Sequence, residues 1–134
     1  MVTMDVELGD ELPEERPDVS LETVRRFVAA AQMNFARFTD HEAARAEGLP
    51  GALIPGVMSQ GQLAAMIHRW APGCSIISID TVFRTPMVVG TPVVCRGAVT
   101  GVNDDGTVEI DLTILSEESG ATGVLGTALV RLAD

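Results

Sequence analysis

Residues 56–70, GVMSQGQLAAMIHRW, decide the fold of this chain. Their side chains are mostly apolar or small, so the apolar face is much wider than the stripe of a helix that lies on a protein surface. We therefore expect one long helix that is buried nearly all round. The Ala71-Pro72-Gly73 segment ends this helix, because proline cannot continue it.

The sequence after this break changes to an extended pattern. Stretches rich in Val, Ile, Leu and Thr follow one another, with turn residues at 104–106 and 118–120 that predict hairpins. The predicted strands cover residues 76–83, 93–103, 107–117 and 121–132. Nothing else in the chain can cover the helix. We therefore predict an α+β fold in which an antiparallel sheet of about five strands wraps around one long buried helix.

Shorter helices are predicted before the long one. Ser20 is a good N-cap for an amphipathic helix over residues 21–33. Thr39 begins a capping-box pattern for a short helix over 41–47. The segment 33–38 between them is predicted to be a loop.

Composition limits the function classes. The chain has 134 residues and a hydrophobic fraction of 46%, which is enough for one domain with a core. A net charge of −10 argues against general affinity for nucleic acid or for anionic membranes. We expect residues 20–134 to form a single domain. Residues 1–19 are expected to be an acidic arm that is solvated and poorly packed, with a candidate short strand over residues 2–8.

Cofactors and export are not expected. Cys74 and Cys95 have no neighbouring histidine in sequence and are interpreted as structural thiols. No metal-ligand spacing and no glycine-rich phosphate loop is present, so we expect neither a metal nor a cofactor. No segment has the pattern of a signal peptide or of a membrane span, and a cytoplasmic location is expected.

Several local motifs carry a resemblance to a known family. Residues 33–40 read MNFARFTD, residues 49–58 read LPGALIPGVM, and residues 83–93 read FRTPMVVGTPV. These stretches resemble the MaoC-like (R)-specific enoyl-CoA hydratases, which carry Asp-x-Asn-Pro-x-His-x-Asp, then Pro-Gly-x-x-x-His-Gly-Met, then Phe-Arg-x-Pro-Val-x-x-Gly-Asp. The resemblance runs from about Phe27 to the C-terminus and implies a hot-dog fold.

The catalytic positions of that family are substituted in this chain. Met33 falls where the family has its catalytic Asp, and Phe38 where it has its catalytic His. Phe35 replaces the Asn, and Pro55 replaces the His before the glycine. A thioether and a phenyl ring carry no transferable proton, and acid/base catalysis contributes about 10² to 10⁴ per group. The isolated chain is therefore expected to be inactive or very weak.

Substrate binding can survive this loss. Gly56 matches the family glycine whose N–H polarises the thioester carbonyl, although it is equally well explained as a closely packed helix start. Met33, Phe35 and Phe38 either line the acyl channel or fill it as core, and we favour filling. Arg84 is a candidate for a CoA phosphate or a partner carboxylate. The full predicted binding set is Met33, Phe35, Phe38, Pro55, Gly56, Val57 and Arg84.

A substitute catalytic residue is the main alternative. His41 lies close in sequence to the lost pair, but a solvated histidine at a helix start explains it better. His68 is interpreted as a polar tip near the end of the long helix.

The resemblance leads to a functional prediction. Family sites lie at the junction of two hot dogs, and exposed sheet edges are usually satisfied by pairing. We expect a subunit that binds an acyl thioester of CoA or acyl carrier protein and acts with a catalytically intact homologous chain. It is expected to be a homodimer or a heteromer. A self-sufficient hydratase, dehydratase or cyclase, and a binding protein for acyl ligands without a reaction, remain alternatives.

Overall fold

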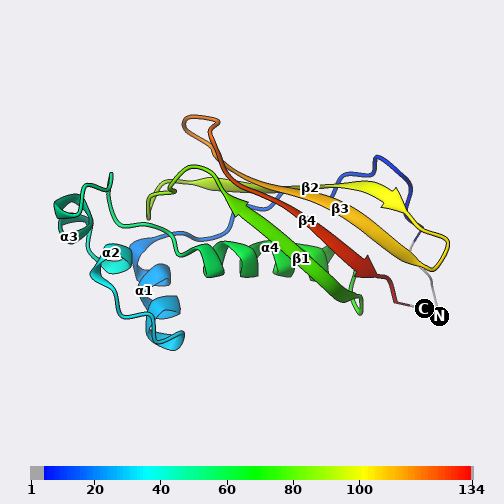
Figure 1. Ribbon diagram of the computed structural model, residues 1–134, viewed down its shortest axis with the longest axis horizontal. Helices are drawn as coiled ribbons and strands as arrows, with labels where there is room; N and C mark the ends of the chain where they lie inside the picture. Colours follow the sequence, from blue (N-terminus) through cyan, green and yellow to red (C-terminus); the bar gives the residue numbers. More distant parts are fainter. Residues whose placement is uncertain (1–4, 134) are drawn as a thin grey trace.

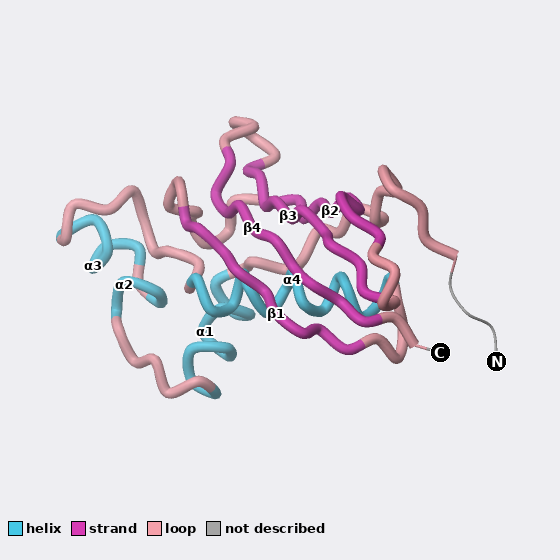
Figure 2. The backbone as a smooth tube through the Cα atoms, turned by 45° about the vertical axis from the view of Figure 1, so that its right-hand side comes forward, coloured by secondary structure: helices cyan, strands magenta, loops and turns pink. Residues whose placement is uncertain are grey.

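The computed structural model describes residues 5–133, which form one sheet with a long helix against it. The elements are α1 (Leu21–Ala30), α2 (Ala36–Thr39), α3 (His41–Ala46), α4 (Gly56–Trp70), β1 (Ser75–Phe83), β2 (Val93–Val102), β3 (Thr107–Ser116) and β4 (Thr122–Arg131). The sheet is antiparallel, with four strands in the order β1-β4-β3-β2. Helix α4 crosses one face of it, and the short helices gather at the end of the molecule where α4 begins (Figures 1 and 2). This confirms the predicted α+β arrangement, with four strands in the sheet where about five were predicted.

The strands follow the alternation of their sequences. In β3 the side chains of Val108, Ile110 and Leu112 are buried, whereas Glu109 and Asp111 are exposed. An antiparallel strand with one wet face produces this period of two. The predicted hairpin turns are confirmed by backbone bonds from Asn103 N to Thr107 O and from Ser116 N to Ala121 O, both 2.9 Å. No helix of the described residues is long and apolar enough to cross a membrane.

Helix α4 is buried on one face only. Its buried residues are Met58, Ser59, Leu63, Met66 and Ile67, and the four apolar ones belong to the core that includes the inner side chains of the sheet. The side chain of Val57 is 63% exposed, and Gly61 and His68 are also exposed. The expectation of burial all round was therefore wrong for the single chain. The sheet curves over one side of the helix and does not close around the other side.

The N-terminal segment over residues 9–19 runs along the outer edge of β2. Gly9 N donates to Val99 O at 2.8 Å, Leu12 N donates to Gly97 O at 2.9 Å, and Glu15 exchanges backbone bonds with Cys95. The side chains of Leu12 and Val19 are buried in the core. The expectation of a poorly packed arm was wrong for these residues, because the unpaired amides and carbonyls of an edge strand need partners. Residues 5–8 form no strand, and residues 2–4 of the candidate strand lie outside the described residues.

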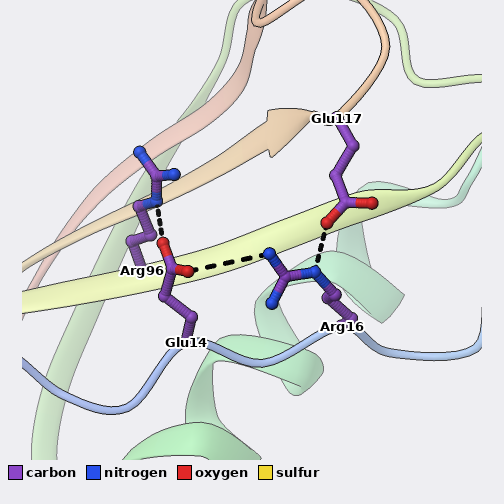
Figure 3. A network of polar contacts seen from close by, with 4 residues as sticks. All are labelled: Glu14, Arg16, Arg96 and Glu117. Carbon is purple, nitrogen blue, oxygen red and sulfur yellow. Dashed lines mark hydrogen bonds and ion pairs between the residues drawn. The ribbon is translucent and has the colours of Figure 1, made fainter.

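Ion pairs accompany this backbone pairing. Glu14 lies between Arg96 of β2 and Arg16, and Arg16 also bonds Glu117 in the hairpin between β3 and β4 (Figure 3). The guanidinium of Arg69, which hydrogen-bonds Glu15, holds the pKa of that carboxyl below its ordinary value. Exposed pairs contribute little to stability, so these acids orient the segment and the buried apolar side chains stabilise it.

The loop between α1 and α3 differs from prediction. Residues 36–39 form the short helix α2, so Thr39 ends one helix and does not cap the next. Asp40 caps α3 instead, because its carboxylate accepts the N–H groups of Glu42 at 2.9 Å and Ala43 at 3.1 Å. Aspartate is as good an N-cap as Ser or Thr, and the sequence pattern placed the cap one residue too early.

Leu12→Ala should lower the free energy of unfolding by about 2 kcal/mol, because it removes a buried side chain that joins the N-terminal segment to the core. Its relative exposure is 3%, against 70% for Leu8 in the same segment. Leu8→Ala is the matched control and should change stability by less than about 0.5 kcal/mol. Urea unfolding measures both variants. Equal small effects would mean that residues 9–19 do not pack as described.

Candidate functional site

A cavity lies where α4 begins. It has a volume of about 520 Å³ and is enclosed by the first turns of α4, the end of β1, the segment 84–87 and the start of β4. Its walls are mostly apolar. The lining residues are Phe38, Leu53, Ile54, Gly56, Val57, Ser59, Gln60, Thr81, Phe83, Arg84, Thr85, Pro86, Met87, Gly123 and Val124. Such a concave, apolar space with few polar groups is the usual form of a small-molecule site.

The start of α4 gives this cavity a polar end. Pro55 precedes the helix and supplies no side-chain cap, and the first bond of the turn runs from Ser59 N to Pro55 O at 3.1 Å. The N–H groups of the first turn therefore have no helical carbonyl to bind. They carry the partial positive charge of the helix dipole, which attracts a carbonyl oxygen or an anion.

Gly56 permits a close contact at this point. A Cβ on Gly56 would lie 2.7 Å from Cζ of Phe83, so the phenyl ring at the end of β1 rests directly on the helix start. Close packing is thus one reason for a glycine here. The Phe83 ring occupies the place that a side chain of residue 56 would take. This contact is compatible with a role of the Gly56 N–H, because the ring carbons accept no ordinary hydrogen bond from it.

The position of Met33 depends on how α1 ends. Gln32 adopts a left-handed conformation with φ of 56°, and Met33 N donates to Val28 O at 3.0 Å. This is a Schellman-type ending, which usually carries glycine at the left-handed residue. It leads the chain sharply away from α1 and leaves Met33 half-buried against the core, outside the cavity wall.

The two phenylalanines of the loop lie differently. Phe38 lines the cavity, whereas Phe35 is 60% exposed and does not. Their rings meet edge to face, with centroids 6.3 Å apart and planes at 81°. The favoured interpretation, that three large apolar side chains fill the vacated site, therefore does not describe this structure. The cavity stays open.

The structure brings together only part of the predicted binding set. Phe38, Gly56, Val57 and Arg84 line the cavity, while Met33, Phe35 and Pro55 do not. The side chain of Arg84 is exposed and makes no ion pair within residues 5–133. A role in binding stays a prediction for each of these residues.

His41 is engaged in the structure of the loop. Its Nδ1 accepts the backbone N–H of Ala52 at 3.0 Å, and Ala52 is fully buried. Gly51 leaves room for this contact, since a Cβ there would lie 3.0 Å from the same nitrogen. His41 does not line the cavity. It is thus neither a purely solvated residue nor a group placed against a ligand.

The remaining nucleophiles lie elsewhere. Burial raises the pKa of the Cys95 thiol to about 12 and also raises that of Cys74. Cys74 Sγ lies 3.6 Å from Nδ1 of His68 at the far end of α4. Within the described part of the chain, no group of three or more His, Cys, Asp or Glu is arranged to hold a metal ion.

Sequence reasoning missed Ser59. It lies in the cavity wall, is only 1% exposed, and its hydroxyl has no hydrogen-bond partner among the described residues. The available signal was its position three residues after Gly56, which places both on one face of the helix.

Comparison with known proteins supports the fold. No family model matches the sequence, and no curated protein matches it. Among solved structures, the (R)-hydratase from A. caviae involved in PHA biosynthesis is similar, with a TM-score of 0.89 and 19% identity over 96% of this chain and 98% of that chain. A chain of the ChsH1–ChsH2 complex from Mycobacterium tuberculosis is similar with a TM-score of 0.88 and 22% identity, over 97% of this chain and 100% of that chain.

A further similar structure is the HadBC (3R-hydroxyacyl-ACP dehydratase) complex from Mycobacterium tuberculosis. Its TM-score is 0.72, at 17% identity over 97% of this chain and 100% of that chain. Structures described as MaoC-like dehydratases are similar as well. The chain therefore has the hot-dog fold of MaoC-like dehydratases and (R)-hydratases, as its motifs predicted.

His41→Ala should lower the free energy of unfolding by about 1 to 3 kcal/mol, because it leaves the buried N–H of Ala52 without an acceptor. His41→Asn is the matched variant, since an amide oxygen can take the place of Nδ1 and recover most of the loss. Thermal or urea unfolding distinguishes the two. If both variants are as stable as the unmodified chain, the hydrogen bond between His41 and Ala52 does not contribute to the free energy of unfolding.

Proposed function

We propose that this chain is a subunit of the MaoC-like hydratase/dehydratase type that binds an acyl thioester but has no acid/base pair of its own. The composition of the cavity wall carries this proposal. Among residues 5–133, those that line the cavity include no carboxylate, imidazole or thiol. Hydrating an enoyl thioester needs one group to activate water and another to protonate the α carbon. Hydroxyl, amide and guanidinium groups do not exchange protons readily near neutral pH.

The features that remain suit binding. An apolar cavity of about 520 Å³ accommodates an acyl chain, and the uncapped first turn of α4 offers amides to a thioester carbonyl. Arg84 lies at the exposed rim, where it can meet a phosphate of CoA or of an acyl carrier protein. A ligand held in this way is polarised but not converted.

The free edge of the sheet supports the proposal that a partner chain binds there. Among the strands of residues 5–133, β1 pairs with β4 alone. Its apolar side chains Ile77, Val82 and Phe83 are 50%, 54% and 56% exposed. Phe83 and the exposed Val57 also line the cavity, so the cavity opens toward this edge. A chain that covered the edge would therefore close the cavity and bring its own side chains to the ligand.

We favour a homologous partner with an intact Asp and His. A second copy of this chain would bring the same substituted loop and no acid or base. The similar ChsH1–ChsH2 and HadBC structures are complexes of different chains, which supports a heteromer. A self-sufficient reaction through His41 has less support, because its Nδ1 is engaged with Ala52 and it does not line the cavity. Both described cysteines are free thiols, in keeping with the cytoplasmic location that we propose.

The purified chain should not hydrate crotonyl-CoA, whereas its complex with an intact homologous chain should. Loss of the conjugated enoyl absorbance measures turnover, at protein concentrations high enough to detect very slow rates. Turnover by the chain alone, abolished by His41→Ala, would replace this proposal with a self-sufficient enzyme.

Co-expression with the intact homologue tests the interface. Val82→Lys places a charge on the free edge and should reduce co-purification strongly, since edge charges oppose strand pairing. Leu8→Lys, at an apolar position beside the opposite edge that is 70% exposed against 54% for Val82, should leave co-purification unchanged. If the chain co-purifies with no intact homologue and is stable as a homodimer, the proposal of a heteromer is contradicted.

A further inference from the structure

The edge strand β1 carries a single charged residue. Its sequence is SIISIDTVF, in which Asp80 is the only charged side chain. This carboxylate is exposed, and no ion pair within residues 5–133 includes it. Its cross-strand neighbour on β4 is the uncharged Thr127, and the next residue in the same row, on β3, is the acid Asp111. The described chain therefore leaves the charge of Asp80 uncompensated at the edge of the sheet.

Asp80 lies on the outer face of the sheet, away from α4. Thr81, its neighbour in sequence, lies on the inner face, where its Oγ1 accepts a hydrogen bond from Gln60 of α4 at 3.1 Å. The side chains of a strand alternate between faces, so Asp80 and Val82 point to the opposite side. Both line a hollow of the outer face together with Asp111. A strand that joined β1 would place its own outer side chains directly beside Asp80.

Symmetry limits how two copies of this chain can meet at β1. If both copies keep their long helices on the same side of the joined sheet, the two β1 strands are antiparallel and a two-fold axis relates them. The regular part of β1 is residues 78–83, because the register with β4 shifts between Ile76 and Ser78. Asp80 lies at the middle of this part. Registers that keep the buried faces together differ by steps of two residues.

The two Asp80 side chains come close in each central register. If the axis passes between them, their Cβ atoms are direct neighbours about 5 Å apart. If the axis passes at Ile79 or at Thr81, they are diagonal neighbours within about 8 Å. Like charges this close repel one another, since the screening length at physiological salt is itself about 8 Å. A homodimer through β1 is thus opposed by a residue of β1.

We infer that Asp80 determines which chain binds at this edge, because it disfavours a second copy of this chain and favours a homologous strand that carries Lys or Arg opposite it. This inference rests on the proposed binding of a partner chain along β1. A cation opposite Asp80 turns the repulsion of the homodimer into an attraction, so one side chain acts on both choices. The exposed Ile77 and Val82 supply apolar contact area to either partner and do not distinguish the two.

Sedimentation equilibrium of the full chain tests the repulsion. Asp80→Asn should raise the self-association constant about fivefold, the effect of one such pair of charges. Asp111→Asn is the matched control, because it removes one charge from the same net −10 on the same face, but two strands from the edge. It should leave the constant nearly unchanged. Added salt should strengthen self-association of the unmodified chain more than that of Asp80→Asn.

A charge-swapped copy of the chain tests the attraction. Fluorescence titration of a labelled Asp80→Lys chain with the unmodified chain should show binding about fivefold tighter than either chain shows with itself, because Lys and Asp then lie opposite each other. An Asp111→Lys chain titrated in the same way should show no such gain. In co-expression with the intact homologue, Asp80→Lys should reduce co-purification and Asp111→Lys should not.

The contrary outcomes are distinguishable. The inference is overturned if Asp80→Asn does not strengthen self-association, if Asp111→Asn strengthens it equally, or if the charge-swapped mixture gains nothing. It is also overturned if Asp80→Lys co-purifies with the homologue as well as the unmodified chain does. None of these results touches the proposed function, which depends on turnover by the complex. Absence of turnover in every complex would overturn the proposed function and leave the association measurements as they are.

Discussion

The packing of α4 across one face of the sheet is the constraint on which the rest of the structure depends. Leu63, Met66 and Ile67 are almost completely buried in this contact, together with sheet residues such as Ile110 and Val124. Each such side chain contributes roughly 1.5 to 3 kcal/mol through burial. Because the contact fixes the helix against the sheet, it also fixes where the first turn of α4 meets the end of β1. The cavity exists at that junction, and its polar and apolar ends follow from the direction of the helix.

Much of this fold was predictable because the spacing of apolar residues along the sequence differs between helices and strands. The change from a helical to an alternating pattern after Trp70 located α4 and the strands, with boundaries that differ by at most a few residues. The N-terminal segment was misjudged, because it is held by backbone bonds to β2 that no side-chain pattern reveals. The exposed face of α4 was also missed. Small and apolar residues indicate burial in general, but not whether the same chain provides the cover.

The site was predictable in outline and not in detail. Motif spacing identified the helix start and the loop before it, and Phe38 and Gly56 do meet at the cavity. Motif spacing gives the order of residues but not the direction in which the chain continues. Here the left-handed Gln32 turns the chain after α1 and so determines where Met33 lies. Ser59 illustrates a second limit. A serine in a helix is unremarkable in sequence, and only the packed structure shows that none of residues 5–133 bonds its hydroxyl.

The N-terminal segment along β2 makes the two edges of the sheet inequivalent. One edge is covered by residues 9–19, whereas the outer side of β1 has no strand partner within residues 5–133. An assembly that joined two chains through β1 would use this free edge in both of them. A sheet open on both sides would instead add chains without limit, which is the geometry of a fibril. Within residues 5–133, the acidic segment thus leaves the sheet with one free edge instead of two.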